Sequence, residues 1–174
     1  MNFDTRYLYI ILGLIVIMNL FSGSFDILGV LLTLPGVLVA ITFHEYAHAL
    51  AAYKLGDDTP KVQGRLNLNP LTHLDPIAVV LLVFTHIGWG KPVEINPNNF
   101  DRKISARAGE AIVAAAGPIM NILLAFVIAI IFYALQVFAT GFAIGTQTGM
   151  IIMTMLQYAL IVNVGLGIFN LIPL

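Results

Sequence analysis

Residues 44–48 read His-Glu-Tyr-Ala-His, a H-E-x-x-H pattern, and directly follow a run from Ile27 to Phe43 that contains no charged residue. On a helix, residues four apart share a face, so the imidazoles of His44 and His48 can converge on one metal ion. Glu45, turned by about 100° around the helix axis, can reach a water molecule bound to that metal. The pattern therefore predicts zinc-dependent hydrolysis of an amide bond at a membrane boundary.

This chemistry requires these residue types. Neutral imidazole nitrogens suit zinc, and three protein ligands leave the fourth tetrahedral position to water. Zinc lowers the pKa of that water toward about 7 and polarises the scissile carbonyl, so Glu45 can take a proton and later return it to the leaving amine. A H-E-x-x-H pattern can also arise by chance in any helix. Ionisable side chains beside hydrocarbon are costly unless they are paired or metal-bound, which favours the functional interpretation.

The composition is that of an integral membrane protein. Apolar residues make up 59% of the chain and charged residues only 10%, with a mean hydropathy of +0.94, whereas soluble domains carry roughly 25% charged residues. The absence of cysteine excludes disulfides and thiol catalysis and leaves His, Asp, Glu and Asn as candidates for metal chemistry. The net charge of -1 argues against a nucleic-acid partner.

We interpret residues 1–174 as one membrane-embedded domain, with a first helix and turn over 1–26 and a catalytic core over 27–174. Four apolar segments are candidate spanning helices: Tyr7–Leu20, Ile27–Tyr53, Ala111–Thr140 and Gly149–Leu174. We expect Ile27–Tyr53 to be a single helix that is kinked at Pro35. Its alanines at 47, 49, 51 and 52 should let a neighbouring helix approach closely.

The segment between Lys54 and Glu110 is rich in Gly, Pro, Asn and Asp and differs from the apolar segments around it. Val62–Leu68 alternates apolar and polar residues, which predicts a strand, and Pro92–Pro97 should be a second extended piece. Ile77–Ile87 is too short for a span of about 20 residues, which favours a re-entrant segment. The predicted fold is mainly α: a polytopic membrane protein with about four transmembrane helices, a short re-entrant segment and a small β element near the cytoplasmic face.

Basic residues predict the orientation of the chain in the membrane. Seven of the eight Lys and Arg residues lie between Glu45 and Glu110, and the connection over 141–148, which we interpret as a glycine-containing turn, has none. The positive-inside rule then places residues 54–110 in the cytoplasm. We expect a multi-pass protein in the cell membrane of a prokaryote, with the active site toward the cytoplasmic side.

Five sequence blocks, in order over about residues 35–174, resemble the site-2 protease family of intramembrane zinc metalloproteases. They are the H-E-x-x-H pattern in its apolar helix, Gly64–Pro76, Gly88–Val93, Ala116–Asn121 and Asn170–Pro173. The resemblance implies an enzyme that holds one zinc ion. Its substrate would be a membrane protein, cut at a membrane-embedded or membrane-proximal segment.

By this resemblance His44 and His48 are zinc ligands and Glu45 is a catalytic residue. Asn170 resembles the family asparagine that polarises the substrate carbonyl or stabilises its oxyanion, although an interhelical hydrogen bond would also explain an asparagine there. The family's third ligand is an aspartate in a Leu-Asp-Gly motif after an Asn-x-x-Pro block. The sequence stops at Leu174, ahead of such an aspartate, so we expect a sequence truncated before its third ligand.

Other polar residues have alternative roles. His73 and Asp75 could supply the missing ligand, but we expect them to hold the re-entrant region in place through hydrogen bonds. His86 lies outside any metal spacing and is interpreted as an interfacial residue. Asn121, one turn beyond Gly117-Pro118, is expected to be structural, because proline frees a backbone carbonyl that an amide can satisfy.

Two functions other than proteolysis are possible for a chain of this composition. The chain could be a catalytically inactive membrane scaffold or binding protein that keeps the protease fold with an incomplete metal site. A transporter or channel is a weaker alternative, since the sequence shows no inverted repeat. The sequence does not define the oligomeric state. For a protease, we expect a strand edge in Val62–Leu68 or Pro92–Pro97 to pair with an unwound substrate.

Overall fold

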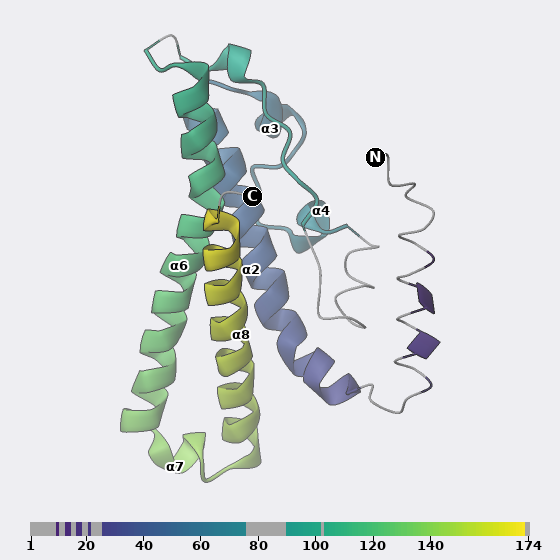
Figure 1. The fold of residues 1–174 in the computed structure, drawn as a ribbon. Coiled ribbons are helices and arrows are strands. Elements are labelled where there is room, and N and C mark those ends of the chain that lie inside the picture. Colours follow the sequence, from purple (N-terminus) through teal and green to yellow (C-terminus); the bar gives the residue numbers. More distant parts are fainter. Residues whose placement is uncertain are drawn as a thin grey trace.

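The computed structural model of the chain describes residues 26–75, 90–101 and 103–172, and ahead of them residues 10, 13, 14, 17, 18 and 21. Three long helices dominate: α2 (Ile27–Lys54), α6 (Ala106–Phe138) and α8 (Gln147–Leu171). Each packs against the other two, and they run side by side in Figure 1. The shorter elements are α3 (Thr59–Val62), α4 (Pro70–His73), the 3-10 helix η1 (Pro97–Asn99) and α7 (Thr140–Ala143).

The three long helices have the length and composition of membrane spans. They contain 28, 33 and 25 residues, with mean hydropathies of 2.1, 2.5 and 1.9 in their most apolar windows. This confirms the helices predicted over Ile27–Tyr53, Ala111–Thr140 and Gly149–Leu174, and it supports a membrane protein. The first predicted helix, Tyr7–Leu20, lies mostly outside the described residues, so a total of four spans stays a prediction.

Helix α2 begins at a side-chain cap and then runs without interruption through the H-E-x-x-H residues. The carboxylate of Asp26 accepts a hydrogen bond from the backbone N–H of Gly29, which satisfies one of the free donors of the first turn. Pro35 lies inside the helix and does not end it. The helix ends at Lys54, where the Leu55 N–H bonds back to the carbonyl of Ala51.

Small residues bring the three helices close together. A Cβ added at Gly36 of α2 would lie 2.7 Å from the Cα of Ala159 on α8, so these two backbones are nearly in contact. The α2 alanines at 40, 47, 49 and 52 are buried. Close approach of this kind is how membrane helices gain packing energy without a hydrophobic driving force between them.

The strand predicted over Val62–Leu68 is wrong. Val62 ends the short helix α3, Gly64 adopts a positive φ of 67°, and the residues after it form turns. Arg65 is the buried residue of this stretch, whereas Val62 and Leu68 are exposed, which reverses the burial that the alternation predicted.

Local hydrogen bonds explain this outcome. The Asn67 side chain donates to the carbonyl of Gly64 and accepts from the N–H of Asn69, and such bonds offer the backbone an alternative to a sheet. In the described part of the chain, β pairing is confined to one antiparallel bridge between Leu74 and Gly90. Pro92–Pro97 forms no strand there, and the predicted re-entrant segment Ile77–Ile87 lies outside the described residues.

A buried carboxylate holds the connecting segments to the end of α2. Asp57 is fully buried and accepts hydrogen bonds from Thr59, from the N–H of Asn96 and from the amide of Asn99. Burial alone would raise the pKa of this carboxyl, but the hydrogen bonds prevail and hold it below its ordinary value. Asp57 therefore links the 57–59 turn to the segment that leads into η1 and α6.

Candidate active site

The two histidines of the pattern converge as their spacing predicted. His44 and His48 lie one turn apart on α2, with ring centroids 4.6 Å apart and nearly perpendicular planes. Their Nε2 atoms are 3.0 Å apart. His44 is buried, and so is the neighbouring Glu45. The helix thus presents two imidazole nitrogens to one point inside the protein.

The other nitrogen of each ring is engaged by α6. The Nδ1 atom of His48 lies 2.6 Å from the backbone carbonyl of Val113, and that of His44 lies 2.5 Å from the side-chain oxygen of Asn121. A carbonyl can only accept, so the proton of His48 resides on Nδ1 and leaves a lone pair on Nε2. Helix α6 therefore sets the direction of both rings.

This donor set fits a zinc ion. Two nitrogens bound to tetrahedral zinc lie about 3.3 Å apart, from Zn–N bonds of about 2.0–2.1 Å, and the two Nε2 atoms are 3.0 Å apart. Two lone pairs facing each other at this distance repel unless a cation or a proton lies between them. Among the described residues, no third His, Cys, Asp or Glu joins the pair.

Gly117 lets the backbone of α6 lie directly against the two imidazole rings. It lies on α6 opposite the histidine pair, and a Cβ added there would lie 2.7 Å from the Cε1 atoms of both His44 and His48. Pro118 follows it and is buried inside α6. The observed positions of the two imidazole rings therefore require a glycine at 117.

Glu45 lies beside the histidines without a full set of partners. Its Oε2 atom is buried and has no hydrogen-bond partner among the described residues, although the backbone of Val93 contributes a hydrogen bond to the carboxyl group. A Cβ at Gly90 would meet this side chain, so the backbone at Gly90 passes directly over it.

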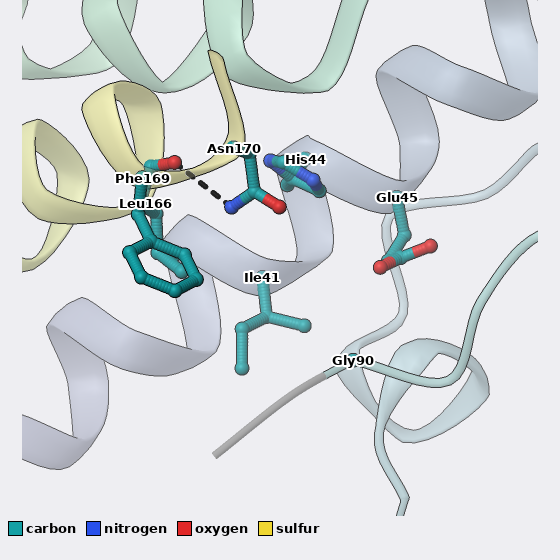
Figure 2. Close-up of a pocket in the computed structure, with 7 residues that line it drawn as sticks. All are labelled: Ile41, His44, Glu45, Gly90, Leu166, Phe169 and Asn170. Atoms are coloured by element: carbon teal, nitrogen blue, oxygen red, sulfur yellow. Dashed lines mark hydrogen bonds between the residues drawn. The ribbon is translucent and has the colours of Figure 1, made fainter. Parts of the chain in front are cut away.

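A cavity of about 220 Å³ lies between α2, where His44 and Glu45 line it, and the end of α8. Figure 2 shows His44, Glu45 and Asn170 around it, together with the backbone at Gly90. Its apolar lining comes from Ile41, Leu166 and Phe169. The structure thus brings Asn170 to the same cavity as His44 and Glu45, whereas His48 is not one of its lining residues. The Nδ2 atom of Asn170 donates to the carbonyl of Leu166 at 2.9 Å, one turn earlier on α8.

The alternative ligands predicted from the sequence lie elsewhere. His73 is fully buried and its Nε2 atom lies 2.8 Å from the carbonyl of Asn67. Burial lowers the pKa of His73, and the positive charge of Arg65 adds to this effect against the opposing hydrogen bond. Its own carbonyl accepts from the Lys91 N–H at 2.8 Å, so His73 connects two described loop segments. The re-entrant segment that we expect it to hold lies outside the described residues. His86 lies outside the described residues.

The partners of three buried polar residues near the site were not predicted from the sequence. Asn121 was expected to satisfy the backbone at the proline, but it contacts His44 instead. Asn163 on α8 was not identified at all, although it is fully buried. Arg65 donates to the carbonyls of Thr72 and Pro92 and so connects the two segments around Gly90. An amide inside an apolar helix is itself a signal, because polar groups are costly there.

The chain is similar in sequence to two proteins that are named as metalloproteases. It is 37% identical over 138 residues to "Putative zinc metalloprotease YwhC" of Bacillus subtilis, an alignment that covers 79% of this chain and 61% of that protein. It is 32% identical over 101 residues to "Putative zinc metalloprotease Rip2" of Mycolicibacterium smegmatis, which covers 55% of this chain and 37% of that protein. The chain thus spans less than two thirds of either relative. No family model matches it, and neither does any solved structure.

Proposed function

The chain belongs to the site-2 protease family of zinc metalloproteases, and from this premise we propose that it hydrolyses a peptide bond in or near a transmembrane segment of a protein substrate. The names of both relatives support a metalloprotease, and the three long apolar helices support a membrane setting. The observation that carries the proposal is the pair of Nε2 atoms, 3.0 Å apart, beside the carboxyl group of Glu45.

His48 and most of the residues that line the cavity have a role in the proposed reaction. A zinc ion held by His44 and His48 would acidify water and polarise the scissile carbonyl. Glu45 accepts a proton from the attacking water and returns it to the leaving amine. The apolar wall formed by Ile41, Leu166 and Phe169 limits the access of bulk water to these groups.

Asn170 is the proposed stabiliser of the substrate carbonyl. It lines the cavity opposite Glu45, where a fixed amide donor to an oxyanion contributes about 3–4 kcal/mol to the transition state. Its Nδ2 group now bonds to the carbonyl of Leu166. To act on a substrate, the amide must share or exchange that bond, so substrate binding should reorient Asn170.

The third ligand is proposed from the resemblance, which implies an aspartate. Two nitrogen ligands alone leave two positions of a tetrahedral zinc ion open, whereas catalytic sites keep three protein ligands. Since no carboxylate joins the histidines within the described part of the chain, we place this ligand outside it.

Substrate binding is proposed to use the segment that leaves the cavity at Gly90. A transmembrane helix hides its peptide bonds in intrahelical hydrogen bonds, so it must unwind before hydrolysis. The backbone from Gly90 toward Pro97 starts directly over Glu45. Beyond its bridge with Leu74 at Gly90, this segment has no β pairing with other described residues. An unwound substrate can add to this segment as a strand. The concentration of basic residues over 54–110 supports an active site on the cytoplasmic side of a prokaryotic cell membrane.

The test is zinc content and proteolysis of the full-length protein as encoded, purified in detergent, with a membrane-segment peptide as substrate. We expect one zinc ion per chain, and Glu45→Gln should keep the zinc while it abolishes cleavage. Glu110→Gln, which changes an exposed carboxylate on α6, is the matched control and should leave both unchanged. A protein that binds no zinc and cleaves nothing would support the inactive scaffold instead.

A further inference from the structure

We propose that Asn163 of α8 is a positioning residue for the metal site: through Asn121 it fixes the tautomer of His44, so that the Nε2 atom of His44 is available to a metal. This inference rests on the proposed zinc function. Both asparagines are fully buried, with an exposed fraction of 0%. Among the contacts that the structure describes, they form a chain of hydrogen bonds from α8 through α6 to α2.

The orientation of the Asn121 amide follows from its partners. Its Nδ2 group lies 3.2 Å from the backbone carbonyl of Ala40 and 2.9 Å from the side-chain oxygen of Asn163. A backbone carbonyl can only accept, so the end of the amide that faces Ala40 must be the nitrogen. The oxygen of Asn121 then faces His44, where it can only accept.

The orientation of the Asn163 amide follows in the same way. Its Nδ2 group donates to the carbonyl of Ala159, one turn earlier on α8, at 2.9 Å. This places its oxygen toward the Nδ2 group of Asn121. Both amides are thus directed by backbone carbonyls, those of Ala40 and Ala159, and neither can be reversed without two acceptors facing each other.

The tautomer of His44 is the consequence. The oxygen of Asn121 lies 2.5 Å from Nδ1 of His44, so that nitrogen must carry the proton, and the lone pair is on Nε2. If the amide of Asn121 were reversed, its NH₂ group would face Nδ1 and favour a proton on Nε2, where it blocks the metal. Among the described residues outside the histidine pair, the backbone of Gly117, which also hydrogen-bonds to the His44 ring, would be the only other partner directing that ring. Partners of ligating histidines act on metal affinity in this way, and their loss typically costs 10–100-fold.

Asn163 also connects the metal site to the helix that carries Asn170. The Asn121 amide contacts all three long helices, through Ala40 on α2 and Asn163 on α8. Asn170 follows Asn163 by two helical turns on α8. One hydrogen-bond chain therefore sets both the direction of His44 and the depth at which α8 presents Asn170 to the cavity.

The test is the nitrogen NMR spectrum of the metal-free full chain, labelled with ¹⁵N-histidine, together with its zinc affinity. Nitrogen shifts distinguish the two tautomers, the sequence has only four histidines, and His44→Gln assigns the signal. We expect the Nδ1–H tautomer at His44 in the wild-type chain. Asn163→Leu removes the nearer of the two acceptors that face the Asn121 amide nitrogen and leaves only the carbonyl of Ala40. It should give a mixture of tautomers and weaken zinc binding by about tenfold.

Two variants separate positioning from a general structural effect. Asn163→Asp, which a fully buried position keeps in its protonated form, retains an O–H donor toward the Ala159 carbonyl and an acceptor toward Asn121, and should restore the wild-type tautomer and most of the zinc affinity. Gln157→Leu removes an exposed amide from the same helix and should change neither.

Two outcomes would overturn the inference. One is an Nε2–H tautomer at His44 in the wild-type chain, which needs no variant to fold. The other is an Asn163→Leu chain with wild-type tautomer and wild-type zinc affinity. A wild-type chain with the expected tautomer that binds no zinc would instead reject the proposed function and leave the hydrogen-bond chain standing.

Discussion

Gly117→Ala should damage the metal site while it leaves the three-helix packing in place. The added methyl carbon would lie 2.7 Å from the Cε1 atoms of both His44 and His48, and it would also contact Nε2 of His48. Carbon atoms in normal contact are about 3.5–4.0 Å apart. The methyl group therefore overlaps both rings by about 0.8 Å or more.

The rings cannot move away without cost. The Nδ1 atom of His44 is held by Asn121 and that of His48 by the carbonyl of Val113. Overpacking of this kind costs about 1–3 kcal/mol, and about 1.4 kcal/mol corresponds to a tenfold change in affinity. Because the methyl group would contact Nε2 of His48 and the Cε1 atom of each ring, we expect this cost to appear in zinc binding, as a loss of roughly 5- to 150-fold.

The assay is zinc affinity by competition with a chelator, with helix content measured by circular dichroism. Gly165→Ala is the matched control, because a Cβ at Gly165 on α8 would meet nothing within 4 Å, and its zinc affinity should be unchanged. Equal zinc affinities for the Gly117→Ala and Gly165→Ala chains would refute the placement of Gly117 against the histidine pair.

Three further substitutions probe the surroundings of the site. Asn170→Ala should lower the cleavage rate by about 100-fold at unchanged zinc content, and an unchanged rate in kinetic assays would leave Asn170 with a packing role only. His73→Gln should keep wild-type zinc content by metal analysis, and a loss of zinc would identify His73 as a ligand. Asp57→Asn should lower the free energy of unfolding by about 2 kcal/mol, because donors that now bond to a charged acceptor lose it. Since the folded pKa of Asp57 lies below its ordinary value of 3.8, its contribution is complete above that pH and is lost as the pH falls through the folded pKa; thermal unfolding at several pH values should show this loss in the wild-type chain and not in Asp57→Asn.

The long helices could be predicted from the sequence because long apolar runs have few alternatives in a membrane, where every backbone group must bond internally. The predicted Ile27–Tyr53 and the observed Ile27–Lys54 differ by one residue. Helix α6 begins at Ala106, five residues before the predicted start, because Ser105 caps it by accepting from the Ala108 N–H. The charged residues at its start obscured this cap, since the prediction followed hydropathy.

The prediction of a strand over Val62–Leu68 was wrong because it rested only on the alternation of apolar and polar residues. Each apolar residue of that stretch would have needed a sheet face to cover it, and no partner strand lies against it in the described part of the chain. Asn67 and Asn69 instead bond to the nearby backbone. Local turn chemistry prevailed over a period-two pattern, as it does wherever short polar side chains can reach their own backbone.

The two histidines could be predicted because their convergence is a local property of one helix. The residues that direct them could not, because Asn121 is 77 positions from His44 in the sequence and the contact depends on how α6 packs. The contact between Asn121 and Asn163 is also non-local, because Asn163 lies on a third helix and is 42 positions from Asn121 in the sequence. An asparagine in an apolar helix indicates that its amide must have hydrogen-bond partners, but only the packing of the helices shows which partners these are.

Small and polar residues act together in this core. A chain of buried amides is stabilising only when every donor and acceptor is satisfied, and side-chain amides are short. The backbones of α2 and α8 must therefore approach as closely as Gly36 and Ala159 do, or Asn121 could not reach Ala40 and Asn163 at once. A larger residue at Gly36 would separate the helices and leave amides unpaired in an apolar interior, at about 1–3 kcal/mol for each lost partner. The small residues Gly36 and Ala159 thus act on the proposed metal site through packing, because they set the distance over which the hydrogen bonds that direct His44 can form.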